Sequence, residues 1–443
     1  MWADAAAETY SRGYVPLRLL RPGDLAQEIR AWCREAVGNE AEAILNLSDR
    51  IVALRECVTT FNLPFLSLPV ETPKDTAIDV FIEMNRSAVQ LSAFDIIVAQ
   101  VEERTGESLH SLVLSLQNRV PLIDFYASAS ELVLSVAALR EDLPPTQASF
   151  QRLNLDRLVK EWDEIAAGVG FALKFLDEEK IFDSERLPTI GVLYTLAAVH
   201  DCVPQILDAS GNAKTLLRKY LWRAFATGRY ENNAATRSLQ NARGLKAVLA
   251  EGKSESQVPI FDAAEFPLPT IGELKRAGWP KRMDTLARCV LAVSLRGGGL
   301  DLADGTPASR AHLKSREYHH LFPDSLLQNV GITDEQPSKA LNCALITWNT
   351  NRNISAKEPI QYLRERVLSA ALGETEIRSR LCTHAIPFDA LNVGGYTNID
   401  DTVLRAQKVW NDYDKFLTAR GQIIMAALKE LCEGRNWPGM RTD

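Results

Sequence analysis

Apolar residues recur at helical spacing along most of this chain. Between Ala41 and Phe61, for example, Ile44, Leu45, Leu47, Ile51 and Leu54 fall on one face of a helix. The same period predicts further helices over residues 107–118, 122–141, 149–177, 189–207, 213–228, 235–250, 281–295, 359–370, 373–382 and 400–433. Alternation of the strand type is scarce, so the pattern predicts a mainly α protein.

A break in the helical pattern divides the chain into two predicted parts. Residues 251–270 open with Gly, Ser, Glu and Gln and are interrupted by Pro259, Pro267 and Pro269. Such a stretch is typical of a domain boundary. We therefore expect a helical region over residues 1–255 and a second domain over residues 265–443.

Composition narrows the class of protein. With 46% hydrophobic and 24% charged residues in 443, the chain has the balance of a globular protein with a sizeable core. The seven cysteines form no CxxC pair, which argues against a zinc finger or ribbon. Their scatter, the absence of a signal-peptide pattern after Met1 and the lack of a long apolar run predict a cytoplasmic protein with no membrane segment.

The candidate chemistry is concentrated around two adjacent histidines, His319 and His320. Neighbouring residues of a strand point to opposite sides, so one ring can bind a metal while the other faces a water molecule. In a hairpin followed by a helix, Asn351 can join His319 as a metal ligand. Asn342 can then accept from the His320 ring and fix its tautomer. The expected cation is Mg²⁺, with Mn²⁺ or Zn²⁺ also compatible with a histidine ligand.

Charge near these histidines points to a phosphate-bearing substrate. The net charge of −7 excludes a generally basic coat, so any nucleic-acid contact must come from a local patch. Nine Lys or Arg residues and three acids lie between Lys275 and Arg316. Lys314, Arg316 and Arg352 are the candidates for gripping a phosphate.

The segment Glu317-Tyr318-His319-His320-Leu321-Phe322-Pro323, together with Ala340 to Thr347, Asn351 to Ser355 and Tyr362-Leu363, resembles a known family. It is similar to the HNH (His-Me finger) endonuclease domain of GmrSD-like restriction proteins, which attack phage or modified DNA. The resemblance implies a small ββα-metal motif inside a helical domain, with His320 as general base and His319 and Asn351 as metal ligands.

Outside that segment the resemblance is carried by helical stretches. Val80 to Asn85 with Leu91-Ser92 looks like the later part of the family's ParB-like regulatory domain, and Tyr413 to Gly434 like its C-terminal tail. The family's Asp-Gly-Gln-Gln-Arg motif does not occur, so we carry over no nucleotide site and expect no NTPase activity. A sensor or NTPase module would then lie on a separate subunit or on a missing N-terminal segment.

The leading hypothesis is a metal-dependent DNA endonuclease or nickase of an antiphage restriction system. Two alternatives stay open. The chain can be a catalytically silent helical scaffold that binds a partner defence subunit, or an HNH nuclease that acts on RNA.

Overall fold

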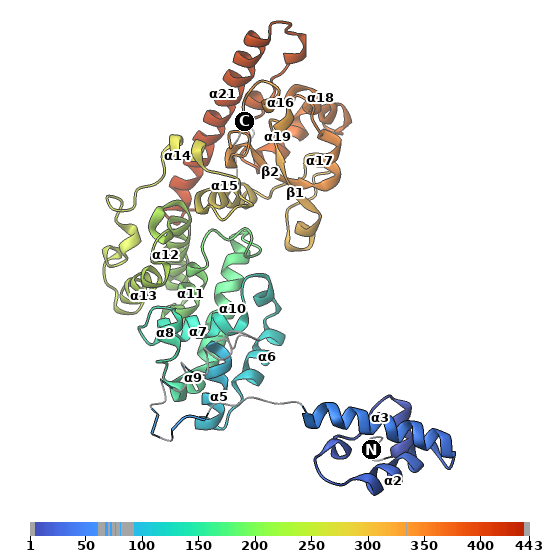
Figure 1. The fold of residues 1–443 in the computed structure, drawn as a ribbon. Coiled ribbons are helices and arrows are strands. Elements are labelled where there is room, and N and C mark those ends of the chain that lie inside the picture. Colours follow the sequence, from blue (N-terminus) through green and yellow to red (C-terminus); the bar gives the residue numbers. More distant parts are fainter. Residues whose placement is uncertain are drawn as a thin grey trace. The chain divides into compact units, whose positions relative to one another are not determined.

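The protein is mainly helical, as the apolar pattern predicts (Figure 1). The computed structural model describes residues 5–60, 93–333 and 335–437, with a few isolated positions between 67 and 80. The predicted matches over Val80 to Asn85 and at Leu91-Ser92 fall almost entirely outside these residues. Contacts between Cα atoms divide the chain into two compact units, Met1–Gln90 and Leu91–Asp443.

The first unit is small and is built from amphipathic helices. Over residues 5–60 its α-helices are α1 (Ala6–Ser11), α2 (Ala26–Val37) and α3 (Ala41–Thr60). In α2 the buried residues are Ile29, Trp32 and Cys33, three and four positions apart, so one stripe of the helix faces inward. These side chains form a separate small core with residues such as Leu19, Leu47 and Ile51.

The second unit contains the remaining helices and the strands. The helices are α5 (Ala93–Thr105), α6 (Leu109–Arg119), α7 (Ala129–Arg140), α8 (Gln147–Phe150), α9 (Leu155–Lys160), α10 (Trp162–Glu178), α11 (Gly191–Ala198), α12 (Leu207–Ala226), α13 (Ala234–Glu251), α14 (Ile271–Arg276), α15 (Thr285–Arg296), α16 (Asp324–Gln328), α17 (Trp348–Ile354), α18 (Pro359–Ser369), α19 (Glu374–Thr383), α20 (Phe388–Leu391) and α21 (Thr402–Leu431). The strands are β1 (Arg316–His320) and β2 (Cys343–Thr347).

Helix α11 lies at the centre of the N-terminal part of this unit and is buried along its whole length. It packs against α7, α10 and α13. Its close approach to α10 depends on Gly168, where an added Cβ would lie 2.3 Å from the Ala197 carbonyl oxygen. A helix that is apolar all round can only be stable inside such a layer of neighbours.

The predicted boundary at residues 255–265 does not separate two cores. One continuous cluster of buried side chains extends from Phe94 to Cys432, and α12 packs on both α15 and α21. Arg223 of α12 is buried and donates hydrogen bonds to the carbonyl oxygens of Ile260 and Phe266. The proline-interrupted segment is therefore fixed onto the core by a buried guanidinium, and the division of the chain lies instead between Gln90 and Leu91.

The two strands form an antiparallel pair that leads directly into a helix. Arg316 pairs with Thr347 and His320 with Cys343, and α17 begins at the next residue, Trp348. In Figure 1 the pair lies beside α17 and α15, and the long helix α21 runs past α14. The fold thus has two antiparallel strands followed by a helix, inside an otherwise helical unit.

Among the residues that the structure describes, no helix combines the length and apolar character needed to cross a bilayer. All seven cysteines are unpaired.

Candidate functional site

The alternation of β1 separates the two histidines, as their adjacency predicts. Residues 317 and 319 face α17, whereas residues 318 and 320 face the loop between α14 and α15. On the first face, His319 Nδ1 lies 2.7 Å from Asn351 Oδ1, and the edge of the ring meets Tyr362 with centroids 6.3 Å apart. On the second face, the rings of His320 and Trp279 are stacked.

Asn351 reaches His319 because the start of α17 is anchored. Thr347 caps the helix by accepting from the Thr350 backbone N–H. Both threonines also donate to the buried carboxylate of Asp301, which accepts from Thr347 N at 2.7 Å and from Thr350 Oγ1 at 2.6 Å. Burial by itself would raise the pKa of Asp301, but these hydrogen bonds outweigh it and lower the pKa, so the anchor is a carboxylate.

The amide of Asn351 is oriented by a second partner. Its Nδ2 donates to Glu317 Oε2 at 2.8 Å, which leaves Oδ1 turned toward His319. Glu317, His319 and Asn351 thus form a row in which each side chain contacts the next through the amide.

His319 is held neutral by its surroundings. The side chain is only 3% exposed, and this burial lowers its pKa to about 4. Its Nε2 is buried without a hydrogen-bond partner. A neutral imidazole has one lone pair to offer to a cation. Because the Asn351 oxygen can only accept, Nδ1 carries the proton in their hydrogen bond, and it becomes a metal ligand when that proton moves to Nε2.

The donor set fits a small divalent cation. Adjacent ligand atoms of an octahedral ion with bonds of about 2.0–2.1 Å lie roughly 2.9 Å apart, close to the observed separation of His319 Nδ1 and Asn351 Oδ1. Glu317 supplies a carboxylate beside them. Over the described residues there is no group of three or more His, Cys, Asp or Glu side chains arranged around one point. Any ion here would therefore depend on the Asn351 amide and on water or substrate oxygens.

His320 presents one nitrogen to the surroundings. The ring is half-buried, Nε2 is enclosed and has no hydrogen-bond partner, and Nδ1 is the nitrogen left accessible. Burial lowers the pKa of His320, so the ring is neutral near pH 7 and can accept a proton.

The predicted contact between Asn342 and the His320 ring is not made. Asn342 is fully buried: its Oδ1 accepts from the Phe322 backbone N–H at 2.8 Å, and its Nδ2 donates to the carbonyl oxygens of Phe322 and Pro337 at 3.0 Å each. Both ends of its amide are bonded to the backbone of the loop that joins the strands. Asn342 therefore fixes the chain that follows His320, and its role is structural.

Of the three residues predicted to contact phosphate, one is buried and two are exposed. The Arg316 guanidinium is buried and donates to the carbonyl oxygens of Gly299, Leu345 and Thr306, so it is not available to a phosphate. Lys314 and Arg352 are exposed. Arg352 lies over the Trp348 ring, with its guanidinium carbon 4.8 Å from the centroid.

Most cations between Lys275 and Arg316 are bonded to other groups of the protein, which argues against the predicted phosphate-binding surface. Arg288 donates to carbonyl oxygens of Ser184 and Leu187, and Arg310 pairs with Asp177. Internal or surface ion pairs and hydrogen bonds also occupy Lys275, Arg282, Arg296 and Arg316. Among these nine cations, the exposed ones without a protein partner are Arg276, Lys281 and Lys314.

A shallow cavity of about 380 Å³ opens at the histidines. It is lined by Tyr318, His319, His320, Pro323, Asp324, Ser325, Asn351, Ser355 and Ala356. His319, His320 and Asn351 therefore line one common opening, whereas Glu317 lies outside its lining.

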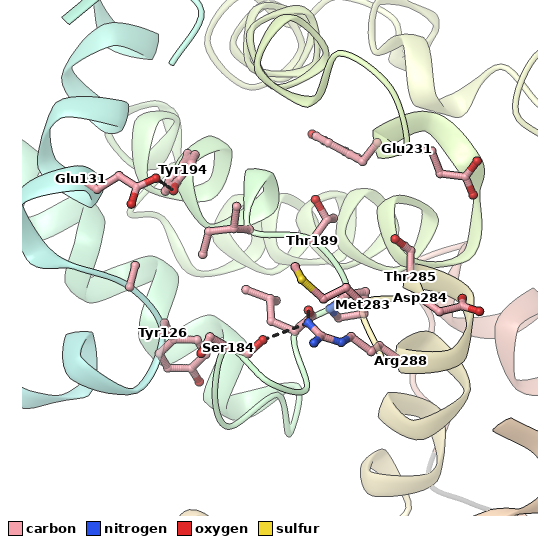
Figure 2. A pocket seen from close by; sticks show the side chains of 15 residues that line it. Tyr126, Glu131, Ser184, Thr189, Tyr194, Glu231, Met283, Asp284, Thr285 and Arg288 are labelled. Carbon is pink, nitrogen blue, oxygen red and sulfur yellow. Dashed lines mark hydrogen bonds between the residues drawn. The ribbon is translucent and has the colours of Figure 1, made fainter. Parts of the chain in front are cut away.

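A larger cavity, of about 770 Å³, lies between α7, α11 and the start of α15 (Figure 2). The Tyr194 hydroxyl donates to Glu131 across it, and the Arg288 guanidinium on its wall is bound to backbone oxygens. None of the predicted site residues lines this cavity.

Three residues of the site, Glu317, Asp301 and Trp279, were not predicted from the sequence as functional candidates. Glu317 stood in the motif, and its position two residues before His319 on a strand was the available signal. Asp301 is one of the three acids within the basic stretch, and nothing in the local sequence marks Trp279. Both residues are brought to the site by tertiary contacts, which local sequence patterns do not predict.

Comparison with known proteins adds little. No family model matches the chain. An uncharacterized protein of the archaeon Methanocaldococcus jannaschii is 20% identical over 395 residues, which cover 83% of this chain and 63% of that relative. The chain thus spans less than two thirds of the relative's length, and an identity this low assigns no family.

Proposed function

We propose that this protein is a metal-dependent endonuclease that hydrolyses phosphodiester bonds of DNA. The observation that carries the proposal is the convergence of His319 and Asn351 at 2.7 Å on an antiparallel strand pair followed by a helix, with His320 on the other side of the same strand. The motif's resemblance to the HNH domain of GmrSD-like restriction proteins supports the same chemistry and favours DNA as the substrate.

In this proposal His320 is the general base. Its accessible Nδ1 takes a proton from a water molecule while the water oxygen forms a bond to phosphorus and the bond to the leaving 3′ oxygen breaks. The lowered pKa keeps the ring unprotonated near neutral pH. Nε2 is enclosed, so it does not compete with Nδ1 for the water.

His319 and Asn351 would hold the cation, with Glu317 keeping the amide oxygen turned toward the site. A bound Mg²⁺ or Mn²⁺ would supply a Lewis acid for the scissile phosphate. Zn²⁺ is a third possibility because an imidazole is among the ligands.

Phosphate contacts would come from Lys314 and Arg352, the exposed members of the predicted set. Lys314 lies just before β1, and Arg352 lies on α17 next to Asn351. A sensor or NTPase subunit that directs cleavage to phage or modified DNA would be a separate partner.

The proposal is tested with supercoiled plasmid and purified full-length protein. We expect cleavage with Mg²⁺ or Mn²⁺ and none with EDTA. His319→Ala should lower the metal-dependent rate at least tenfold, while His110→Ala, which replaces an exposed histidine of α6, should leave it unchanged. Cleavage that persists in EDTA, or that His319→Ala leaves intact, would contradict the proposed mechanism.

A further inference from the structure

We propose that Trp279 is a positioning residue for His320: its indole holds the plane of the imidazole, and with it the accessible Nδ1, in place at the cavity. The inference rests on the proposed nuclease function. It assigns a role to a residue outside the motif, in the loop between α14 and α15.

The contact between the two rings is close and nearly parallel. Their centroids lie 4.1 Å apart with an interplanar angle of 16°. The same indole also meets Tyr318, at 6.3 Å and 54°. Because residues 318 and 320 share one face of β1, Trp279 covers the end of that face.

The stack restricts the imidazole more than ordinary burial would. A histidine ring rotates about χ2 in a broad, roughly two-fold well. An indole lying flat on one face prevents the intermediate orientations, in which the imidazole edge would enter the indole. The enclosed Nε2 of His320 has no hydrogen-bond partner, so this nitrogen does not fix the orientation of the ring. Asp324 acts on the imidazole through its charge. The stacked indole is the direct contact that holds the plane of the ring.

Trp279 can act in this way because its own backbone is braced. The preceding Gly278 N–H donates to Asp284 Oδ2 at 2.9 Å, and the Trp279 carbonyl accepts from the Arg282 N–H at 2.9 Å. Asp284 is also the N-cap of α15. On the other side, Ala277 accepts from the N–H of Ala340, two residues before Asn342. The loop therefore connects a helix start to the segment that fixes the chain after His320.

The kinetic consequence is a loss of turnover with little change in substrate affinity. A misplacement of a catalytic group by about 1 Å can cost on the order of 100-fold in rate. We expect Trp279→Leu to lower kcat for plasmid cleavage by roughly 10–100-fold, with KM changed less than about threefold. Trp279→Phe keeps an aromatic face and should restore most of the turnover.

The control is Trp410→Leu, which removes an exposed tryptophan of α21 whose ring meets that of Tyr413. It should leave kcat within about twofold of the parent. If Trp279→Leu lowers kcat no more than Trp410→Leu does, or raises KM alone, the positioning role is overturned.

A second readout does not depend on nuclease activity. In protein with ¹³C-labelled histidine, the ring C–H resonances of His320, assigned by their loss in His320→Ala, should lie upfield because the indole ring current shields them. Trp279→Leu should move them downfield. Unchanged resonances would overturn the stacking in solution.

The kinetic and the NMR measurements together distinguish failure of the proposed nuclease function from failure of the proposed ring contact. A parent protein that cuts no plasmid but shows the shielded resonance refutes the proposed function while the ring contact stands. If the leucine variant does not fold, Trp279→Phe replaces it, since a smaller ring must shield His320 less.

Discussion

Buried polar side chains around the β1–β2 pair are satisfied mainly by backbone groups. Asn342 binds the backbone of Phe322 and Pro337, Arg316 binds three carbonyl oxygens, and Arg420 of α21 donates to the carbonyls of Leu341, Cys343 and His384. An unpaired buried polar group costs free energy, so each of these residues protects several backbone groups at once.

Asn342→Ala should therefore destabilise the fold. The substitution leaves the Phe322 N–H and the Phe322 carbonyl oxygen without partners at a fully buried position, and it removes one of two donors from the Pro337 carbonyl oxygen. We expect the free energy of unfolding to fall by about 2–4 kcal/mol, measured by urea denaturation followed by circular dichroism. Asn349→Ala, at an exposed position of α17, should change it by less than about 0.5 kcal/mol. Equal effects of the two substitutions would contradict the structural role of Asn342.

His384 gives the protein a pH-dependent stability. It is fully buried, its Nε2 bonds the Leu300 carbonyl oxygen, and burial lowers its pKa to about 4. In the unfolded chain the ring takes up a proton near pH 6.5. The unfolded state thus binds more protons between these two pH values, and stability falls as the pH drops through this window.

Comparing the free energy of unfolding of the parent with that of His384→Leu isolates the contribution of His384 to the pH dependence, since all other groups titrate in both proteins. The variant loses the bond to Leu300 and should be less stable at pH 7. Between pH 7 and pH 5 the difference in free energy of unfolding between parent and variant should narrow by about 2 kcal/mol, because only the parent carries the buried imidazole. Urea denaturation at both pH values measures it, and a gap independent of pH would show that His384 is not held neutral.

At the scale of elements, α17 is positioned by Asp301 from a loop 46 residues away in sequence. The carboxylate accepts from Thr347, Thr350 and the loop N–H of Ala303, so it joins the helix start to the segment after α15. The helix is only seven residues long. A helix this short needs tertiary anchoring to be stable.

Asp301→Asn should loosen α17 and disturb Asn351. One acceptor oxygen becomes an NH₂ group facing donors, which should lower the free energy of unfolding by about 1–3 kcal/mol. Asp304→Asn, at an exposed neighbouring carboxylate, is the control. We also expect plasmid cleavage to fall in Asp301→Asn at temperatures where the variant is still folded. Equal stability of the two variants would rule out the anchoring role.

Local sequence signals were sufficient for the elements of the site but not for its outer contacts. The period of β1 placed His319 and His320 on opposite faces, and the following helix brought Asn351 to His319. The partners of Asn342 and Arg316 could not be predicted, because they are carbonyl groups of loops such as those at Gly299 and Pro337. The long predicted helix over 149–177 is broken into α8, α9 and α10: Asn154 caps the start of α9, and a second break falls at Glu161, between α9 and α10.

At the scale of the whole molecule, the unit that contains the site has one main core, which runs across the proposed boundary, and a smaller cluster around Leu295 and Leu345. The proline-interrupted segment suggested a boundary, yet Arg223 fixes that segment to α12, and α12 packs on α15 and α21. Composition alone cannot distinguish a linker from a loop that is laid over a core.

Residues 265–443 expressed alone should therefore fail to fold cooperatively. Separation would expose the buried faces of α15 and α21 that contact α12. A fragment of residues 93–437 keeps the whole core and should show a sharp thermal transition. Circular dichroism and limited proteolysis of the two fragments test this. A protease-resistant, cooperatively melting 265–443 fragment would restore the boundary near residue 260.

The central claim is that His320 is the general base of a nuclease, and it is tested most directly by plasmid cleavage with Mg²⁺. His320→Ala is compared with His312→Ala, which replaces an exposed histidine just before β1. The account predicts that His320→Ala lowers the cleavage rate by 100-fold or more, a loss on the order of that expected for a general base, while His312→Ala cuts like the parent. A His320→Ala protein that cuts as fast as the His312→Ala protein would contradict the account.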